Sequence, residues 1–259
     1  MLDALFRENV RPLRGKLTLA FCNVAAYARF DAENAGDSRR VDEDFNRLWS
    51  IEKLDAPRSS VELARARELR PLVDQTDFLL DLHSMSHASE ALLLAGPLEK
   101  GRALAREVGF PALVVCDEGH AAGRRMRDYG GFGDPSSPKN ALLVECGQHW
   151  SRRTVEIARE TTLRFLARFG LIDAERAGVG HAPPPQRVVE VTHPITIATD
   201  AFRFVAPYTG GEVIEHAGTI IGWDGEREVR TPYDRCVLVM PAKRLEPGLT
   251  AVRLGRLLS

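Results

Sequence analysis

Short apolar runs alternate with polar, helix-like segments over the first two thirds of the chain. Four runs have the length of strands buried in a sheet, at residues 78–82, 91–95, 112–116 and 141–144. Helical spacing of apolar residues runs over residues 60–70, 98–108 and 151–169 and ends near glycine or proline, and capping serines precede the first and the third of these segments. This alternation predicts an α/β domain with a mixed sheet flanked by helices. A short helix over residues 2–9 and a buried strand over 16–23 are expected before it.

The pattern changes after a proline-rich segment. His181-Ala-Pro-Pro-Pro-Gln186 predicts a stiff linker, which we place at residues 183–187. Beyond it, short alternating strands separated by Gly, Pro and Asp turns predict a small all-β domain over residues 188–259. We therefore expect an α/β domain of catalytic type over residues 1–182, followed by this β domain.

Composition narrows the class of protein. The 259 residues are 44% hydrophobic and 27% charged, and no apolar run approaches the length of a membrane-spanning helix. The formal net charge is −1 and the arginines are mixed with acidic residues, which argues against nucleic acid or a membrane as a partner. The first residues lack the pattern of a secretory signal, so a cytoplasmic location is expected. The four cysteines are expected to be reduced.

Two residues with chemical character follow buried strands. His83 comes after the run 78–82, preceded by Asp81, and Glu145 follows the run 141–144. Ligands of open α/β sheets bind beyond the carboxyl ends of the strands, so we expect His83 to be a metal ligand and Glu145 a general base. A structural histidine and a carboxylate paired with an arginine are the alternatives.

Polar loops offer further candidates. Asn46 and Arg47 combine an amide with a guanidinium, which suits binding of a substrate carboxylate, although a solvated surface pair is the alternative. His87 and Glu90 form a weaker candidate pair of metal ligands. The glycine-rich segment 118–140, with its arginines and Tyr129, is either a pocket loop or disordered.

Three motifs together resemble the succinylglutamate desuccinylase/aspartoacylase family of zinc amidohydrolases, which is related to the zinc carboxypeptidases. They are Asp44-Phe-Asn-Arg-Leu-Trp49, Asp81-Leu-His83 and Glu145-Cys-Gly147, and the resemblance extends to the carboxyl-terminal β region. It implies one Zn²⁺ bound through His83 and a catalytic Glu145 that deprotonates water and then protonates the leaving amine. It also implies that Asn46 and Arg47 bind the substrate carboxylate and that Arg39 polarises the scissile carbonyl.

One family motif is missing. The remaining zinc ligands of the family lie in a His-Gly-x-Glu motif, which does not occur in the sequence. We therefore expect an incomplete zinc site and an N-terminally incomplete catalytic domain. Three hypotheses follow: a hydrolase of N-acyl amino acids or similar amides, inactive or active in this form; a non-catalytic protein that binds small carboxylates; and a truncated fragment of low stability. Whether the chain forms homo-oligomers is left open.

Overall fold

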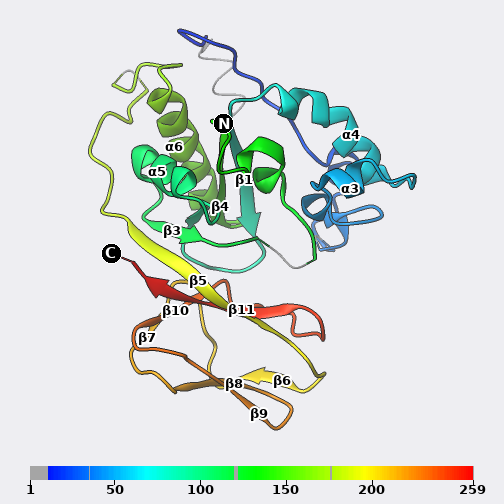
Figure 1. Cartoon of the computed structure of the whole chain (residues 1–259), viewed down its shortest axis with the longest axis vertical. Helices are drawn as coiled ribbons and strands as arrows, with labels where there is room; N and C mark the ends of the chain where they lie inside the picture. The colour runs from blue at the N-terminus through cyan, green and yellow to red at the C-terminus, as the bar shows by residue number, and fades with distance from the viewer. Residues whose placement is uncertain (1–10, 35, 120–121, 176, 259) are drawn as a thin grey trace. The chain divides into compact units, whose positions relative to one another are not determined.

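A computed structural model describes residues 11–34, 36–119, 122–175 and 177–258 (Figure 1). The helix expected over residues 2–9 lies outside these ranges. By their internal contacts the described residues form two compact units. The larger unit comprises residues 11–13, 82–118 and 143–258, and the smaller unit comprises residues 14–81 and 119–142, within these ranges.

An eight-stranded mixed sheet runs in the order β1-β4-β2-β3-β5-β11-β10-β7. Strands β2, β3 and β5 pair in parallel, whereas β4 pairs antiparallel with β2 and the strands beyond β5 pair antiparallel with their neighbours. The strands are β1 (Phe78–Met85), β2 (Leu92–Leu94), β3 (Leu113–Cys116), β4 (Asn140–Gln148), β5 (Arg187–Thr196), β7 (Val213–Ile214), β10 (Cys236–Val239) and β11 (Thr250–Leu257).

A separate three-stranded antiparallel sheet lies in the carboxyl-terminal region. It consists of β6 (Phe202–Phe204), β8 (Ile220–Asp224) and β9 (Arg227–Arg230). Its buried face includes Phe202, Ile221 and Val229. The predicted fold class, a mixed sheet with helices and a small β region, is confirmed. The domain division at residues 183–187 stays a prediction; pairing of β3 with β5 carries the main sheet across that segment.

Helices α5 (Glu99–Val108) and α6 (Arg152–Arg168) pack beside each other in the larger unit, and α5 also contacts β3 (Figure 1). Gly109 ends α5 in the left-handed conformation with φ of 73°, as a helix-ending glycine does. The helices of the smaller unit are α2 (Val24–Tyr27), α3 (Ile51–Leu54) and α4 (Val61–Asp74). Within the described residues, no helix is both long and apolar enough to cross a membrane.

Three expectations are wrong. Residues 16–23 form no strand, and Phe21 is 66% exposed, because apolar composition makes no strand without a paired neighbour. Strand β1 is not buried on both faces, since Phe78 and Leu82 are exposed. The helix expected to end at about residue 70 continues through Pro71, since α4 runs to Asp74 and the missing N–H falls within its last turn.

Candidate functional site

Residues 44–49 form a tight turn in the smaller unit that carries Asn46 and Arg47. Asp44 caps the short 3-10 helix η2 (Phe45–Arg47), since its Oδ1 accepts a hydrogen bond from the Asn46 N–H at 3.0 Å. The Arg47 guanidinium donates through Nη1 to the Asn46 carbonyl at 2.6 Å. Both residues are half-buried, so the turn holds them with little freedom.

Apolar side chains of the same turn fix it to the core of the smaller unit. The rings of Phe45 and Trp49 lie 5.8 Å apart, and those of Trp49 and Tyr129 lie 5.6 Å apart, both in edge-on geometry. Leu48 and Trp49 are almost completely buried, and the Trp49 N–H donates to the Arg124 carbonyl at 3.2 Å. The motif therefore alternates core residues with half-buried polar ones.

Arg39 reaches the same turn from η1 (Asp37–Arg39). Its Nη2 donates to Oδ2 of Asp44 at 2.9 Å, while 63% of its side chain is exposed. Burial raises the pKa of Asp44, but the charge and hydrogen bond of Arg39 and the charge of Arg47 outweigh this, so the pKa lies below its usual value. The structure thus brings the charges of Arg39 and Arg47 close to one carboxylate, to which Asn46 donates through its backbone N–H.

The sequence predicts that His83 follows the end of its strand. In the structure His83 lies within β1, because this strand continues to Met85. Its side chain is half-buried, and Asp81, two positions before it, is buried. Alternate residues of a strand point to the same face, so the two side chains share one face of the sheet. The predicted ligand therefore comes from a strand and not from a loop.

Glu145 also lies inside its strand, since β4 runs on to Gln148. It is 9% exposed and stands opposite Leu92 in the antiparallel register with β2. Burial, together with the charge of Glu145, raises the pKa of the neighbouring Cys146 to about 12. Cys146 is therefore protonated at neutral pH and unsuited to act as a nucleophile. Like it, Cys116 and Cys236 are free and buried, while Cys22 is half-buried.

The sequence does not predict one contact between two polar residues, which lies next to His83. Ser84 Oγ lies 2.8 Å from Nδ1 of His149, and the His149 N–H donates to the Met85 carbonyl at 2.9 Å. His149 shows no spacing typical of a ligand, and only the position of β1 and the end of β4 brings it beside Ser84. The weaker candidate Glu90 forms an ion pair with Arg187 at 2.6 Å.

The described part of the segment 118–140 is ordered by buried ion pairs. Arg125 Nε lies 2.7 Å from one carboxylate oxygen of Asp128, and Arg127 Nη1 lies 2.6 Å from the other. Burial raises the pKa of Asp128, but the two guanidinium charges hold it below its usual value. Tyr129 donates through its hydroxyl to Asp74 at 2.8 Å. These contacts give Arg125, Arg127 and Tyr129 a structural role in the loop.

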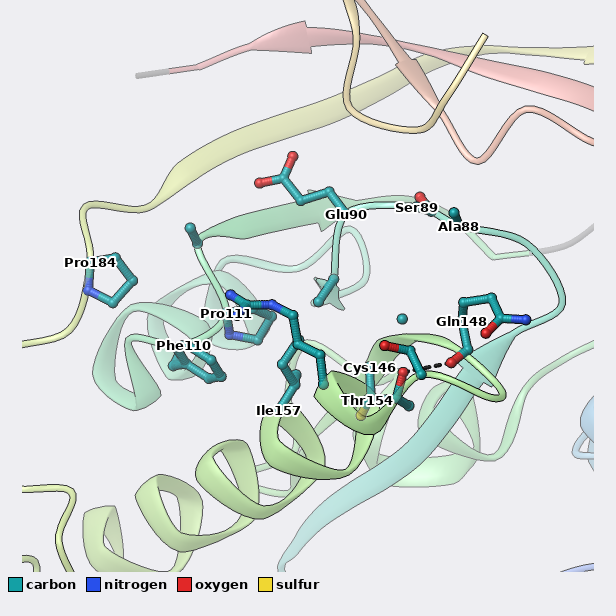
Figure 2. Close-up of a pocket in the computed structure, with 15 residues that line it drawn as sticks. Ala88, Ser89, Glu90, Phe110, Pro111, Cys146, Gln148, Thr154, Ile157 and Pro184 are labelled. Atoms are coloured by element: carbon teal, nitrogen blue, oxygen red, sulfur yellow. Dashed lines mark hydrogen bonds between the residues drawn. The ribbon is translucent and has the colours of Figure 1, made fainter. Parts of the chain in front are cut away.

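A pocket of about 640 Å³ lies in the larger unit. Its lining includes Cys146, the residue that follows Glu145. Figure 2 shows Phe110, Pro111 and Pro184 toward one end of it and Gln148 toward the other. The Thr154 hydroxyl donates to the Gln148 carbonyl at 2.7 Å and so joins α6 to the end of β4. The lining is mainly apolar and includes the weaker candidate Glu90. The candidates Arg39, Asn46, Arg47, His83 and Glu145 are not among the lining residues.

Zinc, which the family resemblance implies, requires at least three protein ligands in known catalytic sites. Across residues 11–34, 36–119, 122–175 and 177–258, no three His, Cys, Asp or Glu side chains form a group that could hold a metal ion. The described residues therefore do not fit a complete zinc site. His83 stays a predicted ligand, and we derive no chemical step through a metal.

Comparison with solved structures shows the fold. No protein-family profile and no curated protein matches the sequence. Succinylglutamate desuccinylase from Vibrio parahaemolyticus matches with a TM-score of 0.67 and 17% identity, over 99% of this chain and 75% of that one. The enzyme from Chromobacterium violaceum matches with a TM-score of 0.65 and 16% identity, over 100% and 79%.

A succinylglutamate desuccinylase/aspartoacylase from Rhodobacter sphaeroides matches with a TM-score of 0.60 and 17% identity, over 88% of this chain and 73% of that one. The three matches share one architecture with this chain at identities too low to transfer an activity. They do agree with the resemblance of the three motifs. The chain has the fold of the succinylglutamate desuccinylase/aspartoacylase family.

Proposed function

We propose that the chain hydrolyses the amide bond of an N-acyl amino acid or a similar small substrate that bears a carboxylate. The observation that carries this proposal is the turn that gathers Arg39, Asn46 and Arg47 around Asp44. The shared fold adds support, as does a product-bound structure of the ectoine utilization protein EutE from Ruegeria pomeroyi, with a TM-score of 0.57 and 14% identity.

In this proposal Arg39, Asn46 and Arg47 recognise the substrate. The half-buried guanidinium of Arg47 and the amide of Asn46 bind the substrate carboxylate, since a guanidinium matches a carboxylate with two parallel hydrogen bonds. Arg39, whose side chain is 63% exposed, polarises the scissile carbonyl. A cation beside this oxygen stabilises the negative charge that develops during attack.

In the same proposal Glu145 supplies proton transfer. Its carboxylate takes a proton from the attacking water and returns it to the nitrogen of the leaving amine. Glu145 is nearly completely buried, so most of its side chain is shielded from bulk water. His83 as a ligand of zinc, and the cytoplasm as the location, remain predictions.

The test compares wild type with Glu145→Gln, which keeps the shape of the side chain and removes its basicity. We expect release of free amine from N-succinyl-L-glutamate or N-acetyl-L-aspartate to fall by about 10²- to 10⁴-fold. The melting temperature should stay unchanged. The control is Glu190→Gln, the same change at an exposed position of β5. Full turnover in Glu145→Gln would remove Glu145 from the role of base.

A second candidate function is non-catalytic binding of small carboxylates. The cluster of Arg39, Asn46 and Arg47 favours it, because guanidinium and amide groups can bind a carboxylate without any chemical step. It predicts that N-acetyl-L-aspartate raises the melting temperature of the chain without being consumed. Arg47→Ala should abolish this shift. A melting temperature that no acyl amino acid changes would count against this function.

A further inference from the structure

Glu62 is a fully buried carboxylate in the first turn of α4, where its exposed fraction is 0%. It accepts hydrogen bonds from three successive backbone N–H groups. The Val41 N–H lies 2.5 Å from Oε1, and those of Asp42 and Glu43 lie 3.0 Å and 3.2 Å from Oε2. Hydrogen bonds to a charged acceptor are the stronger kind, so this carboxylate fixes the backbone of residues 41–43.

Asp42 and Glu43 also accept hydrogen bonds from residues at the start of α4. Oδ2 of Asp42 accepts a hydrogen bond from the Val61 N–H at 2.7 Å, which satisfies an N–H that the helix leaves without an internal partner. Glu43 accepts from the Ser60 hydroxyl and from Arg58, whose Nη2 lies 3.0 Å from Oε2. The loop and the amino end of α4 therefore hold each other.

The fixed segment lies directly between the predicted substrate-binding residues. Arg39 precedes it, and the turn with Asn46 and Arg47 follows it. Asn23 adds a second connection: its Nδ2 lies 3.2 Å from Oε1 of Glu62 and 3.4 Å from the Arg39 carbonyl. Burial raises the pKa of Glu62, but the backbone N–H groups outweigh this and hold it below its usual value, so the carboxylate is ionised at neutral pH.

We propose that Glu62 is a positioning residue for substrate recognition, which sets Arg39 relative to Asn46 and Arg47 by fixing the backbone between them. This inference rests on the proposed function of the turn as a binding site for a carboxylate. Glu62 itself contacts backbone and the Asn23 amide. Its effect on the substrate is therefore indirect.

The first test measures the loop without substrate. Glu62→Gln keeps the volume of the side chain but turns an NH₂ group toward backbone donors, which leaves at least one N–H without an acceptor. Hydrogen exchange at the amides of Val41, Asp42 and Glu43 should become at least about tenfold faster. Glu68→Gln is the matched control, since Glu68 lies on the same helix with 68% of its side chain exposed. Unchanged exchange in Glu62→Gln would overturn the inference.

The second test separates binding from chemistry. With N-succinyl-L-glutamate as substrate, Glu62→Gln should raise KM by about tenfold, because it loosens ground-state binding by Asn46 and Arg47. It should also lower kcat, because Arg39 is no longer held for the scissile carbonyl. Asn23→Ala, a milder change that removes one bond to Glu62, should shift KM in the same direction if Glu62→Gln does not fold. A fall in kcat with KM unchanged would overturn the role in recognition.

Failure of the proposed function gives a different result. If wild type neither hydrolyses N-succinyl-L-glutamate nor is stabilised by it, the turn is not a binding site for this class of substrate. The exchange rates still decide whether Glu62 fixes residues 41–43, since that measurement needs no ligand. Faster exchange without any binding would leave Glu62 as a residue of loop stability and refute its role in recognition.

Discussion

The carboxylate of Asp44 connects Arg39, predicted to polarise the scissile carbonyl, with Asn46, predicted to bind substrate. Oδ2 accepts from Arg39 Nη2 at 2.9 Å, while Oδ1 accepts from the Asn46 N–H at 3.0 Å. An exposed ion pair by itself contributes little to the free energy of unfolding. The contact therefore matters mainly for geometry, because it holds a mobile guanidinium beside a rigid turn.

Asp44→Asn should accordingly impair binding more than stability. The amide keeps one acceptor oxygen but loses the charge that attracts Arg39 and Arg47. We expect KM for N-succinyl-L-glutamate to rise about tenfold, while the free energy of unfolding falls by about 1 kcal/mol. Steady-state kinetics and urea unfolding measure the two quantities. The control Asp31→Asn changes a carboxylate that accepts from Glu33 and Asn34 in an exposed loop; an equal rise in KM there would contradict the prediction.

Gly123 packs closely against the turn at residues 44–49. Its φ is 145°, and a Cβ atom there would lie 2.3 Å from the Arg47 carbonyl oxygen. Gly123→Ala should displace Arg47 and weaken the thermal shift produced by N-acetyl-L-aspartate. Gly130→Ala is the control, since its φ of 52° carries backbone strain but nothing lies within 4 Å of the added atom. We expect this control to lose about 1 kcal/mol of stability and to keep its ligand response. Equal ligand responses in both variants would exclude the steric explanation.

The buried group of Arg125, Arg127 and Asp128 predicts sensitivity to acid. The pKa of Asp128 in the folded chain lies below the value of about 3.9 expected in the unfolded chain, so the unfolded state binds its proton more readily. Its stabilising contribution is complete above about pH 4 and is lost as the pH falls through the folded pKa. Asp128→Asn should cost about 3 kcal/mol at pH 7, because it leaves two buried guanidiniums without their counter-ion.

Urea unfolding of wild type and Asp128→Asn at pH 7 and at pH 3 checks this prediction. The difference in unfolding free energy between the two proteins should shrink at pH 3. Asp134→Asn, in an exposed part of the same loop, serves as the control and should match wild type at both values. A difference that does not depend on pH would mean that Asp128 acts through packing rather than charge.

The sequence pattern predicted the elements better than their ends. Apolar runs located β1 and β4, but polar residues that continue the pairing extend these strands to Met85 and Gln148, which places His83 and Glu145 inside them. Arg253 and Arg256 interrupt the apolar pattern of β11, so hydrophobic periodicity does not locate this strand. Hydrophobic periodicity reports burial, whereas strand length depends on the neighbouring strand.

The sequence predicts only those parts of the candidate site that depend on neighbouring residues. The motif at residues 44–49 is local in sequence, and the structure shows its capping and packing much as residue types suggest. The sequence does not indicate the role of Glu62, since an acidic residue in the first turn of a helix usually interacts with the helix dipole. Its contacts to Val41, Asp42 and Glu43 span about twenty residues and exist only in the folded chain.

Zinc content provides the sharpest test of the family resemblance. The described residues contain no group of three ligands, and His83 alone cannot hold a metal ion tightly. We therefore expect the purified 259-residue chain to retain well below one zinc ion per chain after dialysis, as measured by elemental analysis. Addition of Zn²⁺ should leave its melting temperature unchanged, because an ion that does not bind the folded state cannot stabilise it. About one zinc per chain in wild type, lost in His83→Ala and kept in the control His216→Ala, would contradict this expectation. That result would show that ligands beyond the described residues complete the site around His83.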